Sequence, residues 1–233
     1  MIILDEETRI FTLQTRHTTY QFKADANRVL LHTYYGPKIR GGDLSRLIRS
    51  VDRGFSPKQD EAGTDRTYSL DTLPQEYSGS GAGDFRLPSL ELELADGSYM
   101  ADLRYVDFRL EKGKYTLEGM PAFWGSPEEA DTLAVILEDA AARVRVELLY
   151  GVFEEFDLIT RAVRIVNGGD TPVRLRRAAS LCLDFPSARL DLLSFDGGHV
   201  KERRLNRSRL RPGVQSVGSV RGISSHQHNP FVV

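Results

Sequence analysis

The sequence predicts an all-β protein, a large antiparallel β-sandwich (a supersandwich) with long edge loops and at most one or two short helices. Apolar residues recur mostly at every second position, which is the period of a β-strand. Gly, Asn, Asp and Pro separate about a dozen such segments at short, regular intervals. These intervals leave no room for the crossover helices of a parallel sheet, so antiparallel sheets are expected.

Two segments, 103–110 and 144–150, show the alternation most clearly. Each is expected to have one face in the core and one wetter face. The core face of the second segment is predicted to consist of Val144, Val146, Leu148 and Tyr150. Its wetter face is predicted to consist of Arg143, Arg145 and Glu147.

Turn residues predict the connections between strands. Residues 159–165 run into Asn167-Gly-Gly-Asp170, and the next apolar segment starts at Thr171, which predicts a hairpin whose turn needs positive φ. The tetrapeptides Ala95-Asp-Gly-Ser98 and Glu111-Lys-Gly-Lys114 predict similar turns. Helical turns are expected only at 42–49 and 127–130, while the polar stretch 52–84 is expected to be a long loop of the kind that often carries function.

Composition excludes several classes of protein. The 233 residues are 40% hydrophobic and 27% charged, which supports a full core. Lys and Arg number 31 against 33 acids, a net charge of −2, so neither nucleic acid nor an anionic membrane is an expected partner. No apolar run approaches the roughly 18 residues of a membrane span, and the first residues are acidic, unlike a secretory signal. A soluble, cytoplasmic protein is expected.

Cysteine and histidine usage argues against disulfides, metals and cofactors. The single cysteine, Cys182, stands in an apolar context and is expected to be a buried, inert thiol. His226 and His228 would share one face of a strand, but no third ligand accompanies them. Contacts of this pair with neighbouring protein are therefore favoured over a metal site.

The densest charge run, 201–211, holds six basic residues and one acid. A phosphate or nucleic-acid patch would be one reading of it, but no aromatic residues for base stacking lie among the arginines. A solvated face or an ion-paired contact between subunits is favoured.

Acid-base catalysis of glycosidic cleavage needs two carboxylates, about 5 Å apart for retention and up to about 9.5 Å apart for inversion. Glu76 and Asp84 in the long loop are the only pair that the sequence suggests as candidates for these two carboxylates. Their favoured alternative is that each accepts backbone N–H groups or pairs with Arg66 and Arg86. From the residues alone, the function of the sandwich stays open.

Nine short blocks, in order and at matching intervals, give the chain a resemblance to a known family. Over essentially its whole length it resembles the N-terminal domain of bacterial α-galactosidases of glycoside hydrolase family 36. The blocks are Tyr34-Tyr-Gly-Pro-Lys-Ile39, Asp52-Arg-Gly-Phe-Ser-Pro57, Leu73-Pro-Gln-Glu-Tyr77, Gly83-Asp-Phe-Arg86, Gly119-Met-Pro-Ala122, Val152-Phe-Glu-Glu-Phe-Asp-Leu-Ile-Thr-Arg161, Val163-Arg-Ile-Val-Asn167, Gln215-Ser216 and Ser224-Ser-His-Gln-His-Asn-Pro-Phe231.

The resemblance implies an arrangement of domains. In the family, a β-supersandwich precedes a (β/α)₈ barrel that carries the two catalytic aspartates of a retaining mechanism. Residues 1–222 are accordingly expected to be the supersandwich and 223–233 the start of the linker to the barrel. The catalytic aspartates would lie beyond residue 233. The chain would belong to an enzyme that releases terminal α-galactose from oligosaccharides such as melibiose or raffinose, but alone it would be inactive.

The resemblance also implies candidate sugar-binding residues. Family members often form tetramers in which this domain reaches the active site of a neighbouring subunit. Asp52 matches a position whose carboxylate accepts hydrogen bonds from galactose, and Arg53 would hold it in place. His199 stands where the family commonly has tryptophan, so the apolar platform for the sugar is replaced by a polar edge.

Two other functions are compatible with the same fold. One is a free-standing carbohydrate-binding sandwich without hydrolase activity, although such a module displays a row of aromatic rings and this chain has a single Trp, Trp124, beside Phe123. The other is an oligomerisation scaffold in which the arginines of 203–211 meet acidic residues of another subunit.

Overall fold

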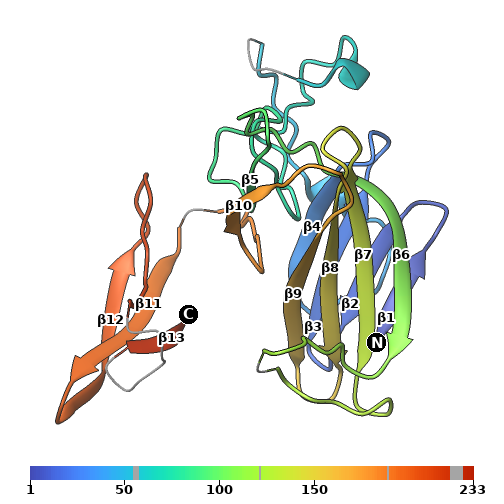
Figure 1. Cartoon of the computed structure of the whole chain (residues 1–233). Coiled ribbons are helices and arrows are strands. Elements are labelled where there is room, and N and C mark those ends of the chain that lie inside the picture. Colours follow the sequence, from blue (N-terminus) through green and yellow to red (C-terminus); the bar gives the residue numbers. More distant parts are fainter. Residues whose placement is uncertain (55–57, 121, 188, 221–227) are drawn as a thin grey trace. The chain divides into compact units, whose positions relative to one another are not determined.

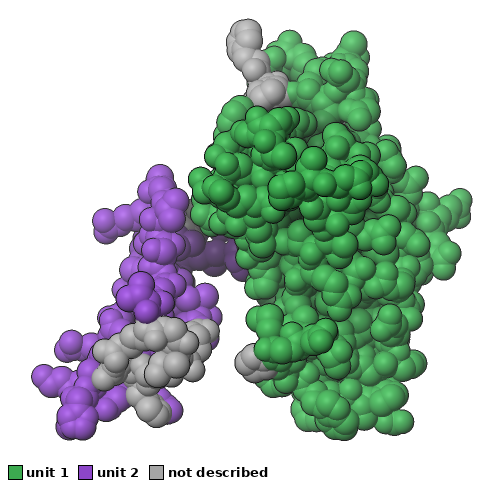
Figure 2. Space-filling model, viewed as in Figure 1, with its two compact units in different colours: residues 1–184 green, residues 185–233 purple. Residues whose placement is uncertain are grey.

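The computed structural model describes residues 1–54, 58–120, 122–187, 189–220 and 228–233. It divides into two compact units, Met1–Asp184 and Phe185–Val233, shown in Figure 2. All named strand pairings are antiparallel, as predicted, and the two short 3₁₀ helices agree with the expected scarcity of helix.

The first unit is a sandwich of two four-stranded sheets (Figure 1). One sheet contains, in this order, β1 (Ile2–Asp5), β2 (Ile10–Gln14), β3 (Thr18–Ala24) and β4 (Leu30–Pro37). The other contains, in this order, β6 (Arg104–Lys112), β7 (Asp131–Asp139), β8 (Val144–Phe153) and β9 (Leu158–Asn167). Side chains from both sheets form one continuous core, in which the rings of Phe22 and Tyr150 stack with centroids 5.0 Å apart.

The predicted core face of β8 is confirmed: Val144, Val146, Leu148 and Tyr150 are all at most 1% exposed. The opposite face is only partly wet. Arg143 and Arg145 are exposed as predicted, but Glu147 is only 7% exposed, so its placement on a wetter face was wrong. Leu149 is buried against Tyr115 and Ala162, because the loop after β6 covers that part of the face. A single strand therefore contributes to two hydrophobic clusters.

The predicted hairpin at 167–170 is wrong. β9 pairs with β8, whereas the next strand, β10 (Arg174–Ala178), pairs with β5 (Leu90–Glu93) in a separate two-stranded sheet. The turn is instead held to the β7–β8 hairpin, since Gly168 N donates to Arg143 O at 2.8 Å and Arg143 pairs with Asp170. Its two glycines do not adopt positive φ.

The two 3₁₀ helices are η1 (Ser45–Leu47), inside the predicted segment 42–49, and η2 (Asp60–Ala62), which was not predicted. Residues 127–129 form a single turn, in which Glu129 N and Ala130 N both donate to Ser126 O at 3.1 Å, so the helical turn predicted at 127–130 is present but does not extend into a helix. The turns at 95–98 and 111–114 do place Gly97 and Gly113 at positive φ.

The second unit contains a three-stranded sheet in the order β12 (Lys201–Arg209), β11 (Asp191–Gly198), β13 (His228–Val232). The arginine run thus forms an exposed strand, in which Arg207 Nε donates to Asp191 Oδ2 of β11 at 2.7 Å. The expected boundary between residues 222 and 223 lies outside the described residues, as does His226. In the described parts of the chain, no helix is long and apolar enough to cross a membrane.

Gly79 lies where the backbone passes very close to that of Ala101, so a side chain at this position should destabilise the sandwich. A Cβ atom at Gly79 would lie 2.0 Å from the backbone oxygen of Ala101, so the two backbone segments could not keep their separation. We expect Gly79→Ala to lower the free energy of unfolding by about 1–3 kcal/mol, as other overpacking changes do. Urea denaturation would measure it. Gly41→Ala is the control, because nothing lies within 4 Å of the added Cβ there; equal effects of both changes would contradict the prediction.

Candidate functional site

Asp52 lies in the long loop region before β5, and its carboxylate is more than half exposed. Its Oδ1 accepts hydrogen bonds from Gly54 N at 2.9 Å and from Arg66 Nε at 3.1 Å. Gly54 has a φ of 49°, a left-handed conformation that favours glycine, so the Asp52–Gly54 turn depends on this residue type. The turn fixes the carboxylate through Oδ1, and none of the described residues donates a hydrogen bond to Oδ2.

Arg53 is anchored separately. Its Nη2 donates to Asp71 Oδ2 at 2.5 Å, and its backbone N donates to Arg66 O at 3.0 Å. The residue that donates to the Asp52 carboxylate is Arg66, which the sequence had not singled out for this role. The next residues of the motif, 55–57, lie outside the described residues.

His199 belongs to the second unit, in the turn between β11 and β12, and is exposed. The following residue, Val200, is 77% exposed and has a φ of 65°. Positive φ is a strained conformation for a β-branched residue, and such strain often marks a functional turn. Asp52 and His199 thus occupy different units, and each is presented to solvent at the tip of a tight turn.

Glu76, one of the two tempting carboxylates, is completely buried. It accepts hydrogen bonds from the hydroxyls of Tyr20 and Tyr150, at 2.8 and 2.7 Å, and from Arg161 Nη1 at 2.6 Å. Burial raises its pKa, but Arg161 and the hydrogen bonds lower it further, so the pKa lies below its usual value. An ionised carboxylate sealed in the core cannot reach a substrate.

Asp84, the other tempting carboxylate, pairs with Arg86 as expected. Arg86 also donates to Asp184 Oδ2 and to the backbone oxygens of Leu70 and Leu73, so the pair braces the loop against the end of the unit. Arg66, the other expected partner, pairs with neither acid, because it binds Asp52, and Glu76 pairs with Arg161 instead. Both acids are structural.

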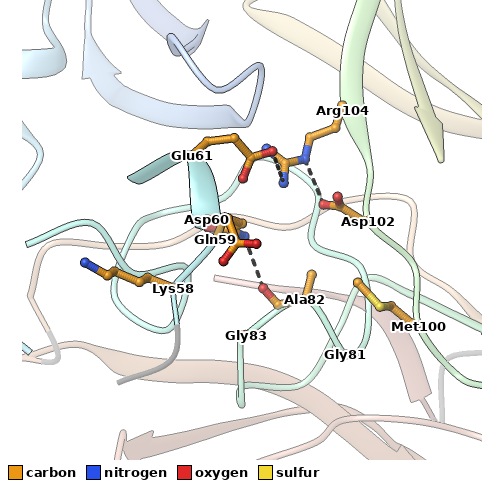
Figure 3. A pocket seen from close by; sticks show the side chains of 10 residues that line it. All are labelled: Lys58, Gln59, Asp60, Glu61, Gly81, Ala82, Gly83, Met100, Asp102 and Arg104. Carbon is orange, nitrogen blue, oxygen red and sulfur yellow. Dashed lines mark hydrogen bonds and ion pairs between the residues drawn. The ribbon is translucent and has the colours of Figure 1, made fainter. Parts of the chain in front are cut away.

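A cavity of about 410 Å³ is lined in part by residues 58–61, which follow Asp52 in the chain (Figure 3). Three segments far apart in the sequence surround it. Arg104 Nε donates to Asp102 Oδ1 at 2.8 Å, and Arg104 Nη2 lies 3.7 Å from Glu61 Oε1. Gln59 Nε2 donates to Ala82 O at 3.1 Å. Its lining consists of Lys58, Gln59, Asp60, Glu61, Gly81, Ala82, Gly83, Met100, Asp102 and Arg104.

Other candidates carry little chemistry. Cys182 is half-buried, and burial raises the pKa of its thiol, which favours the unreactive protonated form. Across the described ranges, no three His, Cys, Asp or Glu side chains gather closely enough to hold a metal ion.

Comparison with known proteins gives a consistent result. The model of the glycosyl hydrolase family 36 N-terminal domain matches residues 28–233. The bifunctional α-galactosidase/sucrose kinase AgaSK of Mediterraneibacter gnavus is 47% identical over 100% of this chain and 25% of its own length. The α-galactosidase AgaA of Geobacillus stearothermophilus is 40% identical over 99% of this chain and 32% of its own length. The chain therefore spans about a quarter to a third of these relatives.

Solved structures agree with these matches. The galactosidase domain of AgaSK superimposes with a TM-score of 0.94 at 47% identity, covering 100% of this chain and 32% of that one. A variant of AgaA from Geobacillus stearothermophilus in complex with raffinose gives a TM-score of 0.90 at 40% identity, covering 96% of this chain and 31% of that one. Another AgaA variant was solved in complex with stachyose.

Proposed function

Because the chain belongs to the glycosyl hydrolase family 36 N-terminal domains, we propose that it is the non-catalytic N-terminal domain of a retaining α-galactosidase. The observation that carries the proposal is that the whole chain aligns with one part of α-galactosidases three to four times its length. The proposed substrates are oligosaccharides with terminal α-galactose, such as melibiose and raffinose. Cleavage itself would fall to a (β/α)₈ barrel elsewhere in the protein, for which residues 223–233 would begin the linker.

The geometry of the acids supports a non-catalytic role. A retaining glycosidase needs two accessible carboxylates about 5 Å apart. Glu76 is sealed among Tyr20, Tyr150 and Arg161, and Asp84 is fixed by Arg86 and Gln75. Neither Glu76 nor Asp84 is therefore available for the reaction.

We assign the domain a part in sugar binding as well. Asp52, positioned by Arg66 and Gly54, would accept hydrogen bonds from galactose hydroxyls, and Arg53 would stabilise the same loop through Asp71. By the same family resemblance, His199 would also contact sugar. In this proposal the domain lies at the rim of a site shared between subunits of a homo-oligomer, a tetramer by family resemblance, in the cytoplasm.

The test compares the 233-residue polypeptide with the full-length protein on p-nitrophenyl α-galactoside. We expect release of p-nitrophenol by the full-length protein only. Circular dichroism of the polypeptide should show β-structure, so that the lack of turnover is not caused by unfolding. Hydrolysis by the polypeptide above the level of a mock purification would contradict the proposed division of labour.

A further inference from the structure

We propose that the cavity between residues 58–61 and 100–104 is a subsite for the sugar units that follow the terminal galactose of an oligosaccharide. The inference rests on the proposed function, since it assigns this cavity to the same substrate that Asp52 would contact. It adds a specificity determinant for chain length, built from residues outside the motif that contains Asp52.

One wall of the cavity, residues 58–61, lies in the same loop as Asp52. Asp52 and Arg66 are joined at 3.1 Å, which closes the loop 52–66. Lys58 Nζ donates to the backbone oxygens of Gly63 and Asp65. These bonds link the two ends of the segment that contains η2. In the proposed subsite, the sugar units that follow a galactose bound at Asp52 would contact the wall formed by residues 58–61.

The charges of the lining favour a neutral ligand. The charged residues of the lining are two cations, Lys58 and Arg104, and three carboxylates, on Asp60, Glu61 and Asp102. The Lys58 side chain points away from Glu61 and Asp102 (Figure 3), and its Nζ donates to the backbone oxygens of Gly63 and Asp65. Arg104 is only 11% exposed and is already paired with Asp102 and Glu61. An anion would meet the excess carboxylates, whereas a ligand hydroxyl can donate to Asp60, whose carboxylate forms no ion pair with another described residue. A hydroxyl group both donates and accepts, so a polyhydroxylated ligand suits this mixture.

One buried acceptor lacks a partner. Gln59 Nε2 is bound to Ala82 O, which fixes the amide, and Gln59 Oε1 is buried with no hydrogen-bond partner among the residues that the structure describes. Unsatisfied buried acceptors are uncommon and call for an explanation. In the proposed subsite, this oxygen would be the acceptor for a ligand hydroxyl.

The remaining surface is apolar and open. Gly81 has a φ of 76°, and a Cβ atom there would come within 3.2 Å of Met100 Cα, so glycine keeps this side of the cavity clear. Met100 is half exposed and offers its side chain to the C–H face of a sugar ring. The volume of about 410 Å³ falls in the range of small-molecule sites.

The experiment uses the full-length protein and measures kcat/KM for stachyose and for p-nitrophenyl α-galactoside. Met100→Trp would fill the cavity, and Asp60→Ala would remove an acceptor from its rim. We expect Met100→Trp to lower the ratio of the two kcat/KM values about tenfold and Asp60→Ala to lower it about threefold, as single polar and steric contacts commonly do. Met120→Trp and Glu111→Ala are matched controls at exposed positions that do not line the cavity, and should leave the ratio unchanged.

Two different failures can be told apart. If both cavity variants keep the ratio of the parent protein while Asp52→Ala weakens both substrates, the cavity is no subsite and the proposed function stands. If Asp52→Ala changes neither substrate, the part assigned to the domain in sugar binding is itself wrong.

Discussion

Replacing Glu76 with glutamine is expected to lower the free energy of unfolding by about 3–5 kcal/mol, because the change leaves a buried charge without its counterion. Glu76 is fully buried, and the side chain of its partner Arg161 is only 8% exposed. The Arg161 guanidinium also lies over the ring of Tyr150, 4.3 Å from its centroid. Arg161 Nε and Nη2 have no partner among the described residues, so Glu76 provides its main compensation.

The effect of Glu76→Gln should depend on pH. Because the pKa of Glu76 is lower in the folded protein than its usual value of about 4.3, ionised Glu76 stabilises the fold at pH values above that value. This contribution is lost as the pH falls through the folded-state pKa. The difference in unfolding free energy between the parent protein and Glu76→Gln should therefore have its full value at pH 7 and shrink progressively below about pH 4. Urea denaturation at several pH values would measure it.

Two controls separate this effect from a general loss of an ion pair. Glu93→Gln removes a carboxylate whose Oε2 lies 3.4 Å from Arg174 Nη1 and 3.5 Å from Arg176 Nε, both in exposed side chains. This change should lower the free energy of unfolding by less than about 1 kcal/mol. The double change Glu76→Met with Arg161→Met removes both buried charges and should recover much of the loss. A Glu76→Gln variant as stable as Glu93→Gln would contradict the assignment.

The sandwich could be predicted from the sequence because strands are recognised from a local pattern, the alternation of apolar and polar residues within a few positions. The period of two along β8 identified all four core residues of the alternating face. The hairpin at 167–170 failed because strand pairing is not local: β10 finds its partner β5 more than eighty residues earlier in the chain, and a Gly-Gly turn is compatible with either outcome. The environment of Glu76 was hidden for the same reason, since its partners Tyr20, Tyr150 and Arg161 lie 56, 74 and 85 residues away.

The candidate site shows the same division. Asp52 could be selected through the motif that contains it, but its partner Arg66 lies 14 residues later in a stretch without regular structure. The cavity could not be foreseen, because three separate loop segments form it. The glycines at 79, 81 and 83 were a partial signal, because two of them, Gly81 and Gly83, adopt positive φ, and at Gly81 the backbone passes close to Met100.

Asp52→Ala in the full-length protein is expected to lower kcat/KM for α-galactosides about 10- to 100-fold, mostly through KM. Hydrogen bonds to a charged acceptor contribute about 1.5–3 kcal/mol each, which corresponds to this range. The described residues bond only to Oδ1 of the carboxylate, so Oδ2 is available to sugar hydroxyls. The unfolding free energy should change by less than about 1 kcal/mol, because the Asp52–Arg66 pair is exposed.

Steady-state kinetics together with thermal unfolding would separate binding from stability. Asp170→Ala is the matched control, since it removes a carboxylate that is 92% exposed and pairs with an exposed arginine. Asp52→Asn keeps the shape and the Gly54 bond but weakens the acceptor, so its kcat/KM should fall between those of the parent and the alanine variant. Unchanged KM and kcat in Asp52→Ala would remove the domain from the sugar site. A fall in the melting temperature that matched the loss of activity would mean that Asp52 acts only by holding the loop.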